Sequence, residues 1–331
     1  HVLRGSIETR ENELRIRSQL IDTNSSETVW SASLQGELSN IWKLQDELTA
    51  KLLSSLPVEL ETIDKVQLLS RYTESTEALA LYRQGLYMIL PPSESKRVQA
   101  ARQLFGRVIE IDPEFAGGYA GAAWSYALPV VFNATETPDK HLTMSRSYAG
   151  QAIEVDPRFG AGHVVLGFAQ VLSGDKVEAL KNARLAAAIQ PGDAFVQFIK
   201  GMIFTLAGLP GEAVAPLAEA LRLNPIETRA PYLNALAIAS VADRQYQSAL
   251  DYLAQNQARG GPQGPHMEVF RAAALVQLVR NEEASAIIRT LNKTFPDYPY
   301  EPWLASWIGP GEHLQSTLTK LSNNGLAFTG E

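Results

Sequence analysis

Two stretches decide the fold: GAGHVVLGFAQVLSGDKVEALKNARLAAAIQP (residues 160–191) and AFVQFIKGMIFTLAGLPGEAVAPLAEALRLNP (residues 194–225). Each starts with an apolar run, passes through a glycine, and ends in an alanine-rich run that is closed by proline. The closing residues, Pro191 and Pro225, lie 34 positions apart. A pattern that returns at a fixed period of about 20–50 residues predicts a stack of similar supersecondary units.

The same landmarks recur on both sides of these stretches. Proline closes the pattern at Pro113, Pro157, Pro191, Pro225 and Pro296. Alanine keeps the same phase at Ala101, Ala179, Ala213, Ala249 and Ala284, and glycine precedes the proline by 24 positions at Gly167 and Gly201. Small facing residues let two antiparallel helices approach closely, and proline ends the second helix of the pair. The pattern therefore predicts helix pairs stacked as a solenoid with a concave and a convex face.

The beginning of the chain, residues 1–35, follows a different pattern. Leu14, Ile16, Ser18 and Leu20 alternate with polar residues, which predicts a strand with one solvated face. Two further strands are expected at residues 2–7 and 29–32, and the polar stretches between the three are expected to be turns. A helix is expected from residue 39 to residue 57, and a second helical stretch at residues 60–69.

Composition excludes several classes of protein. The 331 residues carry 29 Lys and Arg against 36 Asp and Glu, a net charge of −7, which argues against direct nucleic-acid binding. No cysteine is present, so disulfides, thiolate zinc sites and thiol nucleophiles are excluded. Residues 115–135 carry no formal charge, but the repeat register makes them part of a helix pair rather than a membrane span. The chain begins at His1, and we expect it to be a fragment.

The sequence contains no pattern typical of an active site. The five histidines (His1, His141, His163, His266, His313) are scattered without metal-ligand spacing, and His163 falls within a predicted helix, where a packed histidine is expected. Gly117, Gly118 and Gly121 are not followed by the Lys-Ser/Thr step of a phosphate-binding loop. Glu282 and Glu283 fall at a predicted helix start, where carboxylates favour the helix dipole. We therefore predict a segment without catalysis, metal or cofactor.

The repeated pattern resembles the tetratricopeptide repeat (TPR). The resemblance rests on the two quoted copies, with Gly174 and Gly208 at the turn between helices and Phe204 as a bulky anchor. Four weaker copies are expected at residues 78–115, 116–159, 230–263 and 265–298, the second with about ten extra residues between its helices. The resemblance implies a mainly α protein, an α-solenoid of about six helix pairs that binds other proteins.

The N-terminal part, residues 1–56, resembles the second half of a TolB-like domain. The resemblance rests on residues 2–7, 14–16, 19–22, 29–31 and 41–48, which read VLRGSI, LRI, QLID, VWS and IWKLQDEL. It implies that the first half of such a domain is missing. It also implies large bacterial signalling proteins, in which such a module precedes TPRs and the N-terminal output unit is an adenylate or guanylate cyclase domain or a winged helix.

These resemblances divide the chain into four parts. We expect a partial TolB-like α/β unit at 1–56, a helical linker at 57–74, the TPR solenoid at 75–298, and a C-terminal capping helix with a tail at 299–331.

The resemblance implies that the first helix of each pair lines the concave surface. The register places an apolar, aromatic set of side chains there: Tyr82, Leu86, Trp124, Val164, Phe168, Phe195, Phe198, Met202, Asn234 and Ile238. The set lacks the Lys/Asn pattern with which some TPRs hold a peptide's C-terminal carboxylate. It would suit an amphipathic helix or an extended hydrophobic segment. The alternative is that these side chains pack within the superhelix or against the TolB-like unit.

The sequence therefore predicts a non-enzymatic interaction and regulatory module. It would hold a protein or peptide partner, a second copy of itself, or its own output domain. By resemblance, the parent is a cyclase-type signalling protein. The alternatives are the sensor region of a winged-helix transcriptional regulator, a cell-envelope scaffold and a small-molecule sensor. The compartment stays open between cytoplasm and periplasm.

Overall fold

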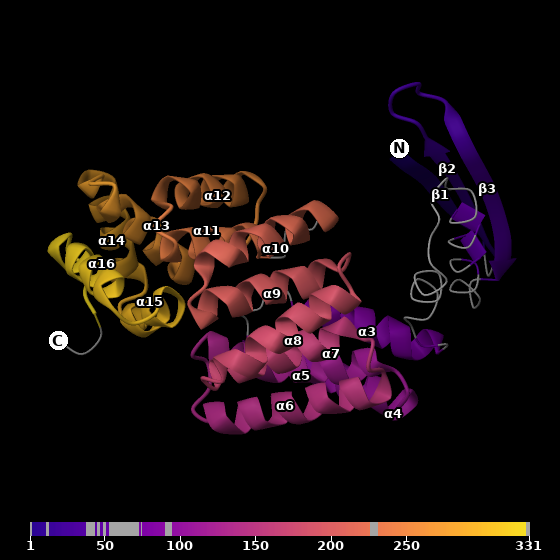
Figure 1. Cartoon of the computed structure of the whole chain (residues 1–331), viewed down its shortest axis with the longest axis horizontal. Coiled ribbons are helices and arrows are strands. Elements are labelled where there is room, and N and C mark those ends of the chain that lie inside the picture. Colours follow the sequence, from indigo (N-terminus) through magenta and orange to yellow (C-terminus); the bar gives the residue numbers. More distant parts are fainter. Residues whose placement is uncertain are drawn as a thin grey trace. The chain divides into compact units, whose positions relative to one another are not determined.

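The structure is a computed structural model that describes residues 2–10, 13–37, 44, 47–48, 51–52, 73, 75–89, 95–225 and 231–328. The chain forms two compact units, His1–Leu79 and Ala80–Glu331 (Figure 1). The finer division predicted at residues 56, 74 and 298 stays a prediction. The helical stretch predicted at 60–69 lies outside the described residues.

The first unit contains the three predicted strands as an antiparallel sheet. Strands β1 (Val2–Arg10), β2 (Glu13–Ile21) and β3 (Thr28–Glu37) follow one another in the order β1-β2-β3. In the register, Ile16 of β2 lies opposite Ile7 of β1 and Leu34 of β3. The predicted alternation in β2 is confirmed, because Leu14, Ile16, Ser18 and Leu20 are buried while the residues between them are exposed.

One face of this sheet carries a small hydrophobic core. Leu14, Ile16 and Leu34 pack with Leu44, which lies in the predicted 39–57 helix. The described residues of that helix (44, 47–48 and 51–52) are helical, and its two ends lie outside the described residues. Strand β1 is exposed along its whole length, and Ile7 is an exposed apolar residue on it. The resemblance to a TolB-like domain stays a prediction.

From residue 76 onward the described chain is helix after helix, arranged as pairs. The first helices of the pairs are α3 (Thr76–Met88), α5 (Ala116–Val131), α7 (Gly160–Leu172), α9 (Ala194–Ala207), α11 (Tyr232–Ala242), α13 (Pro265–Gln277) and α15 (Tyr300–Ile308). The second helices are α4 (Ser95–Ile111), α6 (Pro138–Val155), α8 (Lys176–Ile189), α10 (Pro210–Leu223), α12 (Tyr246–Ala258), α14 (Asn281–Thr294) and α16 (Glu312–Asn323).

The two sets of helices form two layers. Each first helix from α5 to α13 packs against the next first helix, whereas the second helices α6, α8, α10 and α12 pack mainly against first helices (Figure 1). The layer whose members lie closer together is on the inside of a curved stack. The first helices therefore form the inner, concave layer, and we call them inner helices and the second helices outer helices. This arrangement confirms the predicted α-solenoid.

The small-residue landmarks mark the close contacts within pairs. A Cβ atom added to Gly167 of α7 would lie 2.9 Å from the carbonyl oxygen of Ala179 on α8. At the equivalent place in the next pair, a Cβ on Gly201 of α9 would lie 3.1 Å from the carbonyl oxygen of Ala213 on α10. The glycine landmark of one helix thus faces the alanine landmark of its partner. A side chain at these glycines would push the two helices apart.

Proline ends the outer helices as predicted. Helices α4, α6, α8, α10 and α14 each end two residues before a proline: Pro113, Pro157, Pro191, Pro225 and Pro296, respectively. At the next helix start, the Asp193 carboxylate accepts hydrogen bonds from the backbone N–H groups of Phe195 and Val196, at 2.8 and 3.0 Å. Such an N-cap satisfies donors that have no partner inside the helix. Gly174 and Gly208 end α7 and α9 with φ of 87° and 89°.

Two regions differ in detail from the expectation. The C-terminal part contains two helices, α15 and α16, where the sequence predicts one capping helix and a tail. The extra residues of the 116–159 copy are absorbed by long helices, since α5 continues through Pro129 and α6 has 18 residues. Within the described residues, no helix combines the length and the apolar character that crossing a membrane requires.

Candidate functional site

The ten side chains predicted to line the concave surface all lie on inner helices. They are distributed as Tyr82 and Leu86 on α3, Trp124 on α5, Val164 and Phe168 on α7, Phe195, Phe198 and Met202 on α9, and Asn234 and Ile238 on α11. The repeat register therefore places them on one layer of the solenoid.

Five aromatic rings connect four of these inner helices. Trp124 contacts Phe168 and Phe195, with ring centroids 5.0 and 5.5 Å apart. Phe198 contacts Tyr232 of α11 edge-on at 5.4 Å. We call these five residues the inner aromatic cluster. Edge-on and tilted ring contacts of this kind add to the stabilisation that burial provides.

Seven of the ten predicted side chains are buried: Trp124, Val164, Phe168, Phe198, Met202, Asn234 and Ile238. Tyr82 and Phe195 are partly buried, and Leu86 keeps 36% of its surface exposed. All of these seven except Asn234 belong to the hydrophobic core of the superhelix, which is the packing that the sequence left open as the alternative. Partner binding through the set as a whole stays a prediction.

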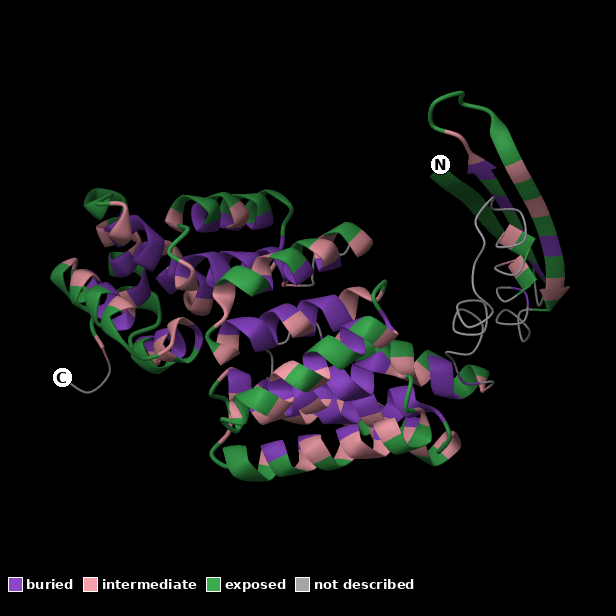
Figure 2. Ribbon diagram, in the orientation of Figure 1, coloured by how far each residue is buried: buried purple, intermediate pink, exposed green. Residues whose placement is uncertain are grey.

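Helix α15 contributes to this burial. It contacts α9, α11 and α13, three successive inner helices. Figure 2 shows the helices of this layer as mostly buried. The Trp303 ring of α15 stacks on Phe132, which follows α5, with the centroids 5.6 Å apart and the planes at 16°. The Trp303 Nε1–H group also donates to the carbonyl oxygen of His266 on α13, at 2.9 Å. The last helix pair thus reaches back across the inner layer to the second one.

The residues of α15 that make this contact are not among the predicted site residues. The buried side chains of α15 are Tyr300, Trp303, Leu304 and Trp307. Their spacing of i, i+3, i+4 and i+7 is the signature of an amphipathic helix and was present in the sequence. The sequence predicts only a cap and a tail for this segment, which follows the last predicted repeat. Phe132 carries no such signal, because its partner Trp303 lies far from it along the chain.

Some polar groups on the inner layer are buried. Asn234 donates through Nδ2 to the carbonyl oxygen of Pro262 at 2.9 Å. Its Oδ1 atom, and the Nε1–H group of Trp307, are buried without a hydrogen-bond partner in the described part of the protein. His163 is buried, as the packed-histidine prediction expects, and its Nε2 donates to the carbonyl oxygen of Pro157 at 2.9 Å.

Two titratable side chains, His266 of α13 and Tyr300 of α15, are neutral at physiological pH. Burial lowers the pKa of His266 to about 4, so its ring is uncharged at pH 7. Burial also raises the pKa of Tyr300 to about 12. Both shifts have the same cause, because an apolar environment disfavours the charged form of either group.

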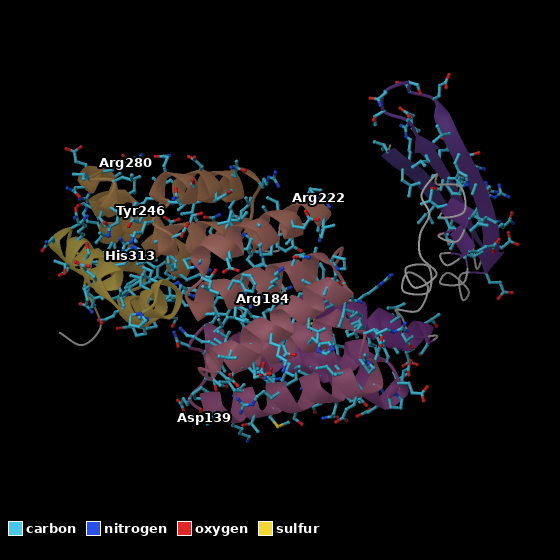
Figure 3. All side chains as sticks on the ribbon, in the orientation of Figure 1. Asp139, Arg184, Arg222, Tyr246, Arg280 and His313 are labelled. Carbon is cyan, nitrogen blue, oxygen red and sulfur yellow. The ribbon has the colours of Figure 1, made fainter. Side chains whose placement is uncertain are left out.

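Charged residues gather on the outer layer instead. Arg222 pairs with Glu219 at 2.6 Å on α10, and Arg280 pairs with Glu283 at 2.7 Å at the start of α14 (Figure 3). Glu283 and its neighbour Glu282 lie in the first turn of that helix, as predicted. Exposed pairs of this kind contribute little to stability, and their main effect is to keep the surface solvated.

The described residues offer no metal centre. No group of three or more His, Cys, Asp or Glu side chains within them could hold a common metal ion. The histidine with the largest pKa shift, His266, packs among aromatic rings rather than beside a nucleophile.

Comparison with known proteins links the chain to one curated sequence. No protein-family model matches it. It is 32% identical over 120 residues to a protein described as "Putative adenylate cyclase 3" from Rhizobium meliloti (strain 1021). The match covers 36% of this chain and 20% of that protein, so the chain matches about a fifth of the relative's length.

Solved structures share the architecture at low sequence identity. A monomeric mutant of IFIT1 is similar with a TM-score of 0.54 and 17% identity, over 88% of this chain and 68% of that one. A TPR protein of Thermus thermophilus is similar with a TM-score of 0.45 and 22% identity, over 60% of this chain and 99% of that one. The helix pairs and their landmarks give the second unit the tetratricopeptide-repeat fold that the sequence predicts.

Proposed function

We propose that this chain is a non-catalytic interaction and regulatory segment of a bacterial cyclase-type signalling protein. Its TPR unit would bind a protein partner, or the output domain of its own parent, at the inner layer. The observation that carries the proposal is the match of 32% identity to a relative described as an adenylate cyclase, combined with the TPR fold. A fold of stacked helix pairs presents an extended surface suited to binding rather than a catalytic cleft.

The inner side of α3 is the best place for a first contact. Leu86 is 36% exposed and lies one turn after Tyr82, which is partly exposed, so the two share a face of the helix. The Tyr82 ring is held edge-on against Phe115 at 5.1 Å and tilted against Phe105 at 6.0 Å. An aromatic side chain fixed in this way loses little freedom when a partner binds, which favours affinity.

The test uses the complete gene that encodes this segment. The full-length product is expressed, and its conversion of ATP to cyclic AMP is measured. The proposal expects cyclase motifs and turnover. A product with a winged helix and no turnover would overturn the proposal in favour of a transcriptional regulator. An export signal without a cyclase would favour an envelope scaffold.

A matched pair of substitutions then tests the surface. Leu86→Glu places a charge on the inner side of α3, and Leu185→Glu places one on the outer helix α8, where Leu185 is 43% exposed. Both should leave the free energy of unfolding within about 0.5 kcal/mol of the unaltered protein, since both sites are exposed. Only Leu86→Glu should change the turnover or its regulation, by a factor of about three or more. An equal response to both changes would contradict binding at the inner side of α3.

A further inference from the structure

Helix α15 departs from the stacking that the other pairs follow. Each outer helix from α4 to α12 packs closely on the inner helix that follows it, but α14 makes little contact with α15 among the described residues. In a regular solenoid each pair contacts only its neighbours. Helix α15 instead contacts α9, three pairs earlier, while its partner α16 packs on α13. The last pair is therefore turned so that α15 lies across the inner layer.

The contacts of α15 have the chemistry of a bound helix. Trp303, Leu304 and Trp307 are buried in the core that α15 shares with the inner layer. Tyr300 is buried toward the end of α14, where its hydroxyl donates to the carbonyl oxygens of Leu291 and Phe295 at 3.4 and 3.0 Å. An amphipathic helix that inserts residues at i, i+3, i+4 and i+7 into an apolar groove is a common mode of peptide recognition. The two tryptophans are one turn apart, and their rings contact each other edge-on at 5.7 Å. The inner layer thus already holds a helical ligand, which is part of the same chain.

The segment that follows α15 would allow the helix to leave the inner layer. After α15 come Gly309 and Gly311, with φ of 79° and 132°, on either side of Pro310. Such glycines can change backbone conformation at low cost. A helix as short as α15 is not stable alone in water, so it would unwind once its contacts were lost. In the folded protein it is held by side-chain packing and by the hydrogen bonds that Trp303 and Tyr300 donate to backbone carbonyl oxygens.

Where α15 meets the inner layer, two buried polar groups lack a hydrogen-bond partner within the described residues. Helices α11 and α15 touch, and each brings a buried polar group without a partner in the described part of the protein: Asn234 Oδ1 on α11 and Trp307 Nε1 on α15. A buried donor or acceptor without a partner is costly. A ligand that satisfied the Asn234 oxygen with a donor of its own would bind more tightly than α15 does.

We propose that α15 is a built-in occupant of the inner groove, and that the partner is a helical segment with two large aromatic side chains one turn apart, which binds by displacing it. This inference rests on the proposed function for its biological meaning, and it adds the chemistry of the partner and the regulation of the site. The tether makes α15 a competitor at high effective concentration, so partner binding is weak until α15 is displaced.

Hydrogen exchange on the unaltered full chain gives the first test. If α15 is a displaceable occupant, the amides of residues 300–308 exchange by a local opening. Under native conditions they should do so at least tenfold faster than the buried amides of α11 and α13, which α15 touches. If residues 300–308 exchange only together with α11, in the global unfolding, the helix is an ordinary part of the core and the proposal is overturned.

A peptide competition gives the second test. The probe is a fluorescent peptide of residues 298–310, titrated into the unaltered protein and into a Trp303→Ala variant, with binding followed by anisotropy. The proposal expects at least tenfold tighter binding to the variant. A peptide with alanine at both tryptophan positions should bind neither protein, and Trp30→Ala in the sheet should behave like the unaltered protein. Equal affinity of the peptide for the Trp303→Ala and unaltered proteins would overturn the proposal. If the Trp303→Ala variant does not fold, the hydrogen-exchange test on the unaltered chain decides whether the proposal holds.

The two proposals fail separately. Peptide binding without any effect of Leu86→Glu on turnover would keep the groove and reject the regulatory role. An effect of Leu86→Glu without peptide binding would keep the regulatory role on α3 and return α15 to the core.

Discussion

Helices α8 and α9 are neighbours of the same length with opposite surroundings. The outer helix α8 buries four alanines along one stripe, and its other residues are half-buried or exposed. The inner helix α9 buries nine of its 14 residues, including Phe198, Ile199 and Phe204. The difference comes from the neighbours, because α9 is packed against α7, α8, α10, α11 and α15. The stack therefore concentrates its hydrophobic core in the inner layer and its charges in the outer one.

This difference bears directly on function. Seven of the ten side chains predicted to bind a partner are buried, so inner-layer substitutions have to be judged first as changes in stability. Outer-layer substitutions are neutral by comparison and serve as controls. Pairs of substitutions of the same kind, one in each layer, test whether inner and outer helices differ in their contribution to stability.

The largest effect is expected at the inner aromatic cluster. Phe168 on α7 has no exposed surface, whereas Val177 on α8 is 77% exposed. Phe168→Ala removes a ring from a packed core and should lower the free energy of unfolding by about 3–5 kcal/mol. Val177→Ala should change it by less than about 0.5 kcal/mol. Urea unfolding followed by circular dichroism measures both. Similar losses for the two variants would mean that the layers do not differ as described.

The next largest effect is expected from the titration of His266, in the first turn of α13, which makes the free energy of unfolding depend on pH. The folded pKa of His266 is about 4, against about 6.5 in an unfolded chain. Above pH 6.5 both states are neutral and stability does not depend on this group. Between pH 6.5 and pH 4 the unfolded chain binds a proton that the folded protein does not. The free energy of unfolding therefore falls as the pH falls, by about 3 kcal/mol in total.

The His266→Gln variant isolates this contribution from the carboxylates, which titrate nearby. The difference in unfolding free energy between the unaltered protein and this variant should be constant above pH 6.5 and should shift against the unaltered protein below it. Unfolding midpoints in urea at pH 7.5, 5.5 and 4.5 measure the difference. If the two proteins lose stability in parallel, the His266 ring is not buried in its neutral form.

The repeat architecture could be predicted from the sequence because its signals are local and periodic. Gly201 and Ala213 stand close together in the sequence, within one helix pair, and Gly167 and Ala179 repeat the relation in the pair before. The alternation of Leu14 and Ile16 with polar residues in β2 is equally local. The alternating pattern follows directly from strand geometry, and the longer repeat follows from stacked helix pairs.

The burial of the candidate site residues could not be predicted in the same way. The register places Val164 and Phe168 on the inner layer correctly, but their burial depends on how tightly the stack curves and on what covers it. The position of α15 is set by long-range contacts such as Trp303 on Phe132, which no repeat period relates. Sequence periodicity gives the layer of a residue, whereas its exposure is decided by tertiary contacts.

The smallest expected effect comes from replacing a helical glycine with alanine, which should change the free energy of unfolding in opposite directions in the two layers. Gly201 lies inside the inner helix α9, where an added Cβ would meet Leu217 Cδ2 at 2.7 Å. Gly150 lies inside the outer helix α6, where an added Cβ would meet nothing within 4 Å. Gly150→Ala should raise the free energy of unfolding by about 0.5–1 kcal/mol, because alanine favours the helix. Gly201→Ala gains the same propensity but should lower stability by about 1–3 kcal/mol, because the added methyl group overpacks the pair. Thermal unfolding of both variants measures the sign, and stabilisation by both would show that the pair α9–α10 can relax around a side chain at its closest point.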